Sequence, residues 1–374
     1  MSTHTPPQLS RQHLTRVLLL ISLVALSLFC SCQQQKKYHI SGYTNAQVGA
    51  DPPMIKLLLN GKAIDSSFVH KGKFLLKGNY VDSMSKNVAY LELPGEEPIP
   101  VILTTQPLSI DFIKRKLLEG DYLNKELNRL YDSLDSLGDD FKRKLATLPP
   151  DSALFDAFDQ DFKVSIDDYI ALAKDYCLRH PNDPVGIIST IMLLTINYES
   201  LLEMVPFIRK YMGPIVLNNR EIALYLLIYD NYYHTAPGTP IVDLTLETLQ
   251  EDTTHLSDHL VPGCYTILHC WSGWCKPCLE EMPNLIKAYD IYHERGLNMI
   301  GIFLWDEGYN LDLLLEEYQL PWTQLYDPSS QTSIAYGIYS IPEIMLIAPD
   351  GTIVARSLRG AELFSTLDSI FGQV

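Results

Sequence analysis

The chain has 374 residues and a formal net charge of −16, from 45 acidic and 29 basic side chains. This length suits about two or three domains, and the acidic balance disfavours nucleic acid and anionic lipid surfaces as partners. Seven cysteines are too few to hold a chain of this size together as a disulfide scaffold.

The segment 1–31 has the composition of a secretory signal. Two arginines precede a short apolar run at 17–29, and small and polar residues follow it. The run is too short to span a membrane comfortably. The segment resembles a bacterial lipoprotein signal, which implies lipid on Cys32, with Cys30 as the second candidate and an uncleaved signal anchor as the alternative. Either arrangement predicts a membrane-attached protein of the cell envelope that faces the periplasm.

Short strands and turn residues alternate over 38–115. The strongest hairpin signal is Asn60-Gly61, and we expect a strand on each side of it. Strands are expected at 54–59, 63–69, 73–76, 87–93, 99–103 and 108–113. This spacing predicts a small antiparallel β domain of the sandwich type.

The region 116–235 has helical periodicity. Leucines recur there at helical spacing, and Asp183 and Pro184 suit the N-cap and the first turn of a helix. Helices are expected at 124–137, 158–178 and 187–196, with one or two more over 211–233. The third is apolar on nearly all sides, so we expect it to be buried, and it is too short to cross a membrane.

A proline-rich stretch at 236–240 marks the start of the last domain, 237–374. Strands are expected there at 265–271, 298–304, 322–326, 344–348 and 352–355, and helices at 276–295, 310–318 and 363–371. This alternation predicts an α/β domain with a mixed central sheet and helices on both faces.

Cys275-Lys276-Pro277-Cys278 follows the first of these strands. Positions i and i+3 of a helix bring Cβ atoms about 5–6 Å apart, within reach of a disulfide. Cys275 would lie at the helix N-terminus, where unpaired N–H groups favour a thiolate, and Pro277 suits the first turn. A structural disulfide or half of a zinc site is the alternative, but no second pair of cysteines or histidines completes four ligands. The pattern favours a redox dithiol.

The last domain resembles the thioredoxin superfamily and, within it, the membrane-tethered thiol-disulfide oxidoreductases of the TlpA/ResA type. The matching segments are ILHCWSGWC (267–275), EMPNL (281–285), YGIYSIP (336–342) and LIAPDGTI (346–353). The β domain is similar to the β-rich N-terminal domain of thioredoxin-like lipoproteins of Bacteroidetes-type bacteria, through 60–66 and 73–78. The resemblance implies a thioredoxin-like C-terminal domain, no bound cofactor, protein disulfides as substrates and a membrane electron donor.

The resemblance also implies roles for the residues of the dithiol motif. Cys275, as the exposed cysteine, attacks a partner disulfide, and Cys278 resolves the mixed disulfide. Trp274 flanks and shields the pair. Lys276 either adds a positive potential that favours the thiolate or is a solvated side chain at the helix start.

Further residues outside the motif carry hypotheses. Pro342 matches the family's cis-proline. In the family, this proline leaves the backbone of its neighbour, here Ile341, free to pair with a substrate strand. Glu343 replaces the threonine common there, so its charge is expected to affect partner choice. Glu281 matches a family glutamate that tunes the proton affinity of the dithiol, or else is a solvent-facing acid. His269 replaces a buried aspartate, and either accepts the proton of the resolving cysteine or is a satisfied core polar group.

The leading interpretation is an envelope-tethered reductase of protein disulfides. The alternatives are an oxidase or isomerase of the same fold, and a periplasmic binding or assembly protein in which 38–235 does the main work. A peroxiredoxin is disfavoured, because no threonine-x-x-cysteine arrangement precedes the dithiol. Cys177 and Cys264 could pair with each other across domains, which the spacing cannot show, but we expect free thiols. Cys270 is expected to be a buried free thiol.

Overall fold

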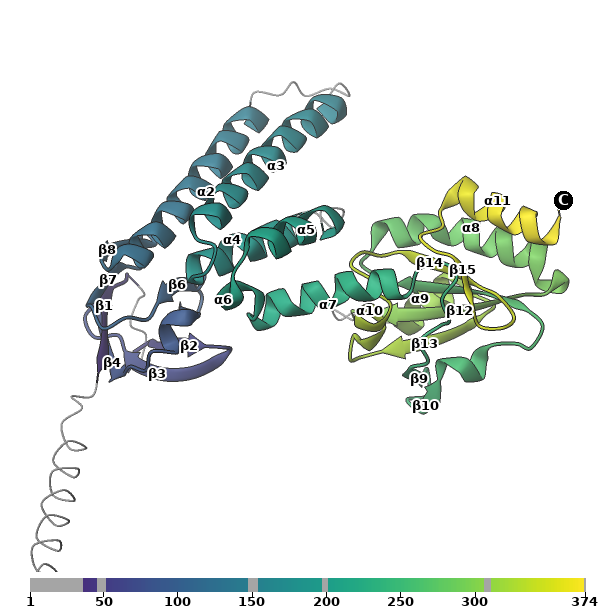
Figure 1. The fold of residues 1–374 in the computed structure, drawn as a ribbon, viewed down its shortest axis with the longest axis horizontal. Coiled ribbons are helices and arrows are strands. Elements are labelled where there is room, and N and C mark those ends of the chain that lie inside the picture. The colour runs from purple at the N-terminus through teal and green to yellow at the C-terminus, as the bar shows by residue number, and fades with distance from the viewer. Residues whose placement is uncertain (1–35, 46–51, 147–153, 197–200, 306–310, 373–374) are drawn as a thin grey trace, which may run out of the picture. The chain divides into compact units, whose positions relative to one another are not determined.

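The computed structural model describes residues 36–45, 52–146, 154–196, 201–305 and 311–372 (Figure 1). The predicted signal 1–31, Cys30 and Cys32 lie outside the described residues. Contacts between residues divide the chain into one unit that ends at Arg129 and a second that begins at Leu130. Over the described ranges, the structure contains no helix with the length and apolar character that crossing a membrane requires.

The first unit contains two four-stranded sheets that share one apolar core. One sheet has the order β4 (Lys73–Asn79), β1 (Lys37–Tyr43), β7 (Leu108–Asp111), β8 (Lys116–Glu119), and the other β3 (Lys62–Phe68), β2 (Met54–Leu59), β5 (Val88–Glu92), β6 (Ile99–Ile102). A 3₁₀ turn at Met84–Lys86 precedes β5. Asn60 and Gly61 both have positive φ angles, as a two-residue hairpin turn requires. The predicted β domain is therefore confirmed as a pair of sheets.

Two strands of this unit differ from the sequence prediction. The strand β1 was not expected, and it pairs in parallel with β7, so the domain is not wholly antiparallel. The strand β8 lies inside the region predicted to be helical, because it folds back on β7 as a hairpin through Arg115, which has a positive φ. Helices therefore begin only at Tyr122.

The helical region follows β8. Its helices are α2 (Tyr122–Ala146), α3 (Leu154–Arg179), α4 (Pro184–Thr195), α5 (Leu201–Tyr211), α6 (Pro214–Leu217) and α7 (Arg220–His234). Asp183 accepts hydrogen bonds from the backbone N–H groups of Val185 and Gly186 and so caps α4, which is buried as expected. The helix α5 was not expected, since Pro206 interrupts its helical pattern.

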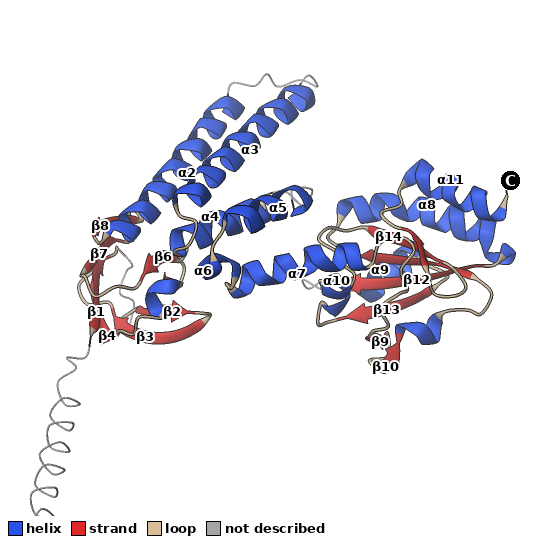
Figure 2. Ribbon diagram, in the orientation of Figure 1, coloured by secondary structure: helices blue, strands red, loops and turns tan. Residues whose placement is uncertain are grey.

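The C-terminal part is built on a seven-stranded mixed sheet (Figure 2). Its order is β10 (Thr253–His255), β9 (Thr245–Thr248), β13 (Thr323–Asp327), β12 (Leu297–Leu304), β11 (Tyr265–Trp271), β14 (Glu343–Ile347), β15 (Ile353–Ala355). The helices are α8 (Lys276–Tyr292), α9 (Leu311–Tyr318), α10 (Gln331–Ala335) and α11 (Gly360–Phe371), with 3₁₀ turns at Leu256–His259 and His293–Arg295.

The strand β11 lies inside this sheet, parallel to β12 and antiparallel to β14. Its side chains alternate between two apolar clusters. Ile267 and Trp271 pack with residues of α8 and α11, whereas Leu268 and Cys270 pack on the other face, where α10 lies. Burial on both faces explains why this strand is apolar along nearly its whole length. It also fixes the position at which α8 begins.

Candidate active site

Cys275 and Cys278 form a disulfide with a Cα–Cα distance of 5.2 Å. The bond lies where the chain passes from β11 into α8. Cys275 is the N-cap of α8, and its Sγ accepts a hydrogen bond from the Cys278 N–H at 3.2 Å. Pro277 occupies the first turn, where its missing N–H costs no hydrogen bond. After reduction, the same N–H group and the helix dipole favour a thiolate on Cys275.

The two cysteines differ in their access to solvent. Cys275 is 3% exposed and Cys278 is 0% exposed. The expectation of an exposed nucleophile is therefore wrong for this oxidised form, because both cysteines lie in an apolar cluster that Trp274 and Ile341 help to cover. Of the two, only Cys275 retains any exposed surface.

The loop that carries Pro342 lies against the dithiol. The Ile341–Pro342 peptide bond is cis, as the sequence resemblance implies. The carbonyl oxygen of Ile341 lies 3.5 Å from Cys275 Sγ. This places the backbone before Pro342 beside the sulfur that we expect to react.

Two tryptophans stack on each other, one shortly after the end of β11 and the other directly after β12. Trp274 donates its indole N–H to the Trp305 carbonyl at 3.0 Å, and the two rings stack with centroids 6.3 Å apart. Trp305 was not singled out from the sequence. Its position in the sequence could have identified it, because it directly follows β12 and β12 is parallel to β11. Neighbouring parallel strands end at the same edge of a sheet. Together the rings form an aromatic wall, whose Trp274 directly precedes Cys275 in the chain.

Lys276 points away from the packed part of the site. Its side chain is 86% exposed, and its ammonium lies 3.5 Å from the Glu280 carboxylate one turn later. An exposed i,i+4 pair of this kind contributes little to stability. This geometry agrees with the interpretation of Lys276 as a solvated side chain at the helix start.

Glu281 is buried, so its interpretation as a solvent-facing acid is wrong. It is 9% exposed, and its carboxylate accepts a hydrogen bond from the Gly360 N–H at 2.9 Å, at the N-terminus of α11. The Arg359 guanidinium lies nearby. Burial lowers the pKa of Arg359, whereas the charges of Glu343 and Glu281 oppose that shift. Arg359 was missed because only the tertiary fold brings it next to α8.

His269 lies beneath the site, fully buried and stacked on Trp271 with ring centroids 6.0 Å apart. Neither of its ring nitrogens has a hydrogen-bond partner among the described residues, so the interpretation as a satisfied core group is wrong. Burial, and secondarily the charge of Arg359, lowers the pKa of His269 to about 3. The imidazole is therefore neutral at physiological pH and a weak base for a thiol proton.

The remaining cysteines in the described part are free, as expected. Cys177 donates a hydrogen bond to Ser189 Oγ at 3.3 Å. Cys270 is fully buried on β11, facing away from the dithiol. Burial raises the pKa of both thiols, which keeps them protonated and unreactive.

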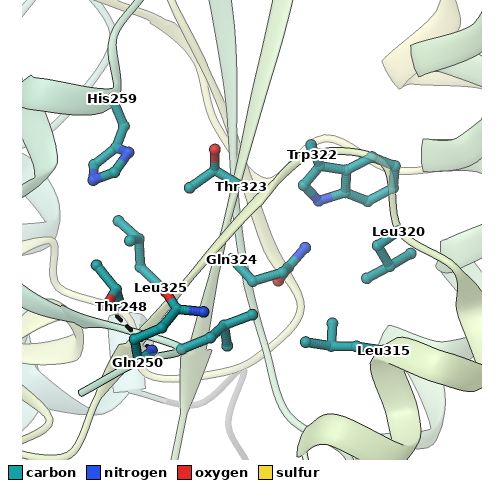
Figure 3. A pocket seen from close by; sticks show the side chains of 10 residues that line it. Thr248, Gln250, His259, Leu315, Leu320, Trp322, Thr323, Gln324 and Leu325 are labelled. Atoms are coloured by element: carbon teal, nitrogen blue, oxygen red, sulfur yellow. Dashed lines mark hydrogen bonds between the residues drawn. The ribbon is translucent and has the colours of Figure 1, made fainter. Parts of the chain in front are cut away.

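A surface cavity of about 470 Å³ lies at β13 (Figure 3). The residues that line it are Thr248, Leu249, Gln250, His259, Leu315, Leu320, Trp322, Thr323, Gln324 and Leu325. Gln324 links this region to the core beneath the dithiol, because its Oε1 accepts the indole N–H of Trp271 at 3.1 Å. None of the residues predicted from the sequence to act in the site lines this cavity.

Comparison with known proteins concerns the C-terminal part of the chain. Residues 237–356 match the AhpC/TSA family. The thiol-disulfide oxidoreductase ResA of Geobacillus thermodenitrificans is 28% identical over 169 residues, which cover 43% of this chain and 96% of the relative. The thiol:disulfide interchange protein DsbE of Allochromatium vinosum is 28% identical over 115 residues, or 30% of this chain and 62% of the relative.

This chain is a homologue of thiol-disulfide oxidoreductases. The predicted class of enzyme and the thioredoxin-like fold are thereby confirmed. Among solved structures, the thioredoxin domain of a thiol-disulfide oxidoreductase from Bacteroides vulgatus is 27% identical with a TM-score of 0.34, covering 36% of this chain and 98% of that one.

We predict that His269 makes the folded protein sensitive to acid. The unfolded chain binds a proton at this histidine below pH 6.5, whereas the folded chain does so only near pH 3. Stability from the neutral imidazole is therefore fully present above pH 6.5 and is lost as the pH falls towards 3. The limiting slope is about 1.4 kcal/mol per pH unit.

The measurement is urea unfolding of the oxidised protein, followed by tryptophan fluorescence, at several pH values between 7 and 4. His269→Phe retains an aromatic ring beside Trp271 and should lose this slope. His255→Phe removes an exposed imidazole and should behave like the wild type. Equal pH dependence in the wild type and His269→Phe would contradict the prediction.

Proposed function

We propose that this protein is an envelope-tethered oxidoreductase that reduces protein disulfides through Cys275 and Cys278. No bound cofactor takes part, and a membrane donor supplies the electrons. The observation that carries the proposal is the disulfide at the N-terminus of α8, whose Cys275 sulfur lies 3.5 Å from the Ile341 carbonyl. Homology to thiol-disulfide oxidoreductases supports the same chemistry.

The reaction begins from the reduced dithiol. The Cys275 thiolate attacks one sulfur of a substrate disulfide; that S–S bond breaks, and the released substrate thiolate takes up a proton. The Cys278 thiol loses its proton and attacks the Cys275 sulfur of the mixed disulfide. The second substrate sulfur leaves as a thiolate, and the enzyme is left with the Cys275–Cys278 disulfide. Two electrons have passed to the substrate, and the membrane donor restores the dithiol.

The aromatic wall and the Ile341 backbone fit a polypeptide substrate. Trp274, the residue before Cys275, and Trp305 offer apolar ring surface, and the carbonyl of Ile341 offers a hydrogen-bond acceptor near the Cys275 sulfur. An extended segment of a partner protein can use both at once, because a strand pairs through its backbone.

Trapping of mixed disulfides tests this function. Cys278→Ser removes the resolving thiol, so Cys275 should stay attached to envelope proteins through bonds that dithiothreitol releases. The measurement is non-reducing electrophoresis followed by mass analysis of the attached proteins.

Cys275→Ser is the matched control and should trap few partners. Equal trapping by the two variants would overturn the assignment of nucleophile and resolver. If neither traps any protein, the alternative of a binding or assembly protein with an idle dithiol is favoured.

Lipid attachment is tested at the N-terminus. Cys32→Ala should release the protein from membranes, because the acyl chains would have no sulfur to join. Continued membrane association, with the signal still attached on mass analysis, would favour the uncleaved signal anchor. Cys30→Ala is the matched control and should remain lipidated. Lipidation that is lost in Cys30→Ala and kept in Cys32→Ala would show that the other cysteine is the anchor.

Glu281 is expected to raise the thiol pKa of Cys275 in the reduced enzyme. It lies one turn after Cys278 on α8, and Cβ atoms one turn apart are about 5–6 Å from each other. Cys278 is in turn the disulfide partner of Cys275. A buried carboxylate at this position disfavours a negative charge on the nearby Cys275 sulfur. Glu281→Gln retains an oxygen for the Gly360 N–H and removes the charge, so the thiol pKa should fall.

Titration of thiolate absorbance measures the shift. Glu280→Gln is the control, because neighbouring helix positions point about 100° apart and the Glu280 side chain is 64% exposed. An unchanged titration in Glu281→Gln, or an equal shift in the control, would leave Glu281 with only its contact to α11.

A further inference from the structure

Arg356 is a buried guanidinium that joins three separate segments of the chain. Its side chain is 5% exposed. Its Nε donates to the Glu343 carboxylate at 3.1 Å, one Nη donates to the Tyr336 carbonyl at 3.1 Å, and the other donates to the Tyr232 carbonyl at 3.1 Å. One side chain thus connects the end of α7 with both ends of the loop that contains Pro342.

The end of α7 suits a cation. The last carbonyl groups of a helix lack partners within the helix and carry its negative dipole end. Arg356 donates to the Thr235 carbonyl at 3.2 Å and to its hydroxyl at 3.0 Å, and the guanidinium lies 4.2 Å from the centre of the Tyr232 ring. These contacts use the planar fork of arginine, which lysine lacks.

Contacts that do not involve Arg356 join α7 to the same loop. Thr235 Oγ1 donates to the Tyr336 carbonyl at 2.9 Å, and the rings of Tyr232 and Tyr339 lie 5.7 Å apart. Gly337 has a φ of +63°, and a Cβ at this position would come within 2.1 Å of the Tyr232 nitrogen. Only glycine allows this approach of the two backbones.

Glu343 is buried in this network and not turned towards a partner. Besides Arg356, its carboxylate accepts hydrogen bonds from the Ser357 N–H at 3.1 Å and the Ser357 hydroxyl at 3.0 Å. The expectation that its charge affects partner choice is therefore wrong. A buried ion pair is weak evidence for a gain in stability, since apolar residues often serve as well. The Glu343–Arg356 pair instead serves to hold the chain segments that it joins in one arrangement.

The loop held in this way reaches the dithiol. Residues 336–342 start at Tyr336, which Arg356 binds, and end beside Ile341, whose carbonyl lies 3.5 Å from Cys275 Sγ. Glu343 follows directly, at the start of β14. Arg356 and α7 thus fix the end of this loop that begins at Tyr336, and the backbone near Ile341, at the other end, is the part offered to a substrate.

We infer that Arg356, supported by α7, is a positioning residue that holds the loop 336–342 in place to receive an extended substrate peptide over Cys275. The inference rests on the proposed function. It extends the substrate-binding apparatus beyond the predicted domain 237–374 to α7. A small disulfide needs no peptide docking, so only protein substrates should depend on Arg356.

The test uses the full chain, reduced beforehand, in single-turnover reactions with two disulfides. Insulin represents a protein substrate, and Ellman's reagent represents a small one. The double variant Arg356→Met with Glu343→Gln removes both charges, so neither is left unpaired. We expect the second-order rate constant with insulin to fall about tenfold, equal to about 1.4 kcal/mol, with less than a twofold change for Ellman's reagent.

Two further variants and one control keep the test interpretable if the double variant folds poorly. Arg356→Lys retains the positive charge beside Glu343 but not the planar fork of the guanidinium. Its rate constant with insulin should therefore fall less than that of the double variant. Gly337→Ala pushes α7 away without touching a charge, and should reproduce the selective loss. Arg295→Met removes another contact between segments, that of Arg295 with the Phe371 carbonyl at the end of α11, and should change neither rate.

The results test the positioning role of Arg356 and the proposed function separately. Equal losses on both disulfides, or no loss on insulin in folded variants, would overturn the positioning role of Arg356. A wild-type enzyme that reduces Ellman's reagent but not insulin would overturn the proposed function, and the inference with it.

Discussion

The end of β11 fixes where α8 begins, and the reactivity of both cysteines depends on that junction. The strand is packed on both faces, so its last residues have one position in the sheet. The first turn of α8 then directs the Cys278 N–H to Cys275 Sγ at 3.2 Å. A helix N-terminus leaves such donors unpaired, which stabilises negative charge on that sulfur alone. Two chemically identical side chains are thereby placed in different electrostatic environments.

Buried charges lie near this junction on α8 and β14. Glu281 holds the N-terminus of α11 through Gly360, and Glu343 binds Arg356. Charges taken out of water are costly unless partners and hydrogen bonds compensate them. Glu281 and Glu343 therefore each hold in place the chain segment that supplies their partner. His269 is the exception, since it is buried without a partner and stays neutral. The surroundings of the dithiol are thus held by paired groups, with one polar side chain left unsatisfied.

Local pattern predicted most of this fold, and long-range contacts account for what it missed. The bounds of β2 and β11 match the prediction, because a turn signal and a continuous apolar run identify them. Asp183 identified the start of α4. The strand β8 was missed because its pairing with β7, and not its composition, makes it a strand. In the site, the motif identified both cysteines. Burial of Glu281 and the three segments joined by Arg356 arise only from tertiary packing, which no local pattern contains.

The reduction potential of the Cys275–Cys278 couple tests most directly whether this protein donates electrons to partner disulfides. The full chain would be equilibrated in dithiothreitol buffers of defined ratio, and the fraction of reduced dithiol measured by thiol alkylation and mass analysis. Each 30 mV amounts to about 1.4 kcal/mol for this two-electron couple. A reductase requires a strongly negative value, near the value of about −270 mV found for thioredoxin. A value near about −120 mV, as in the oxidant DsbA, would contradict the reducing direction.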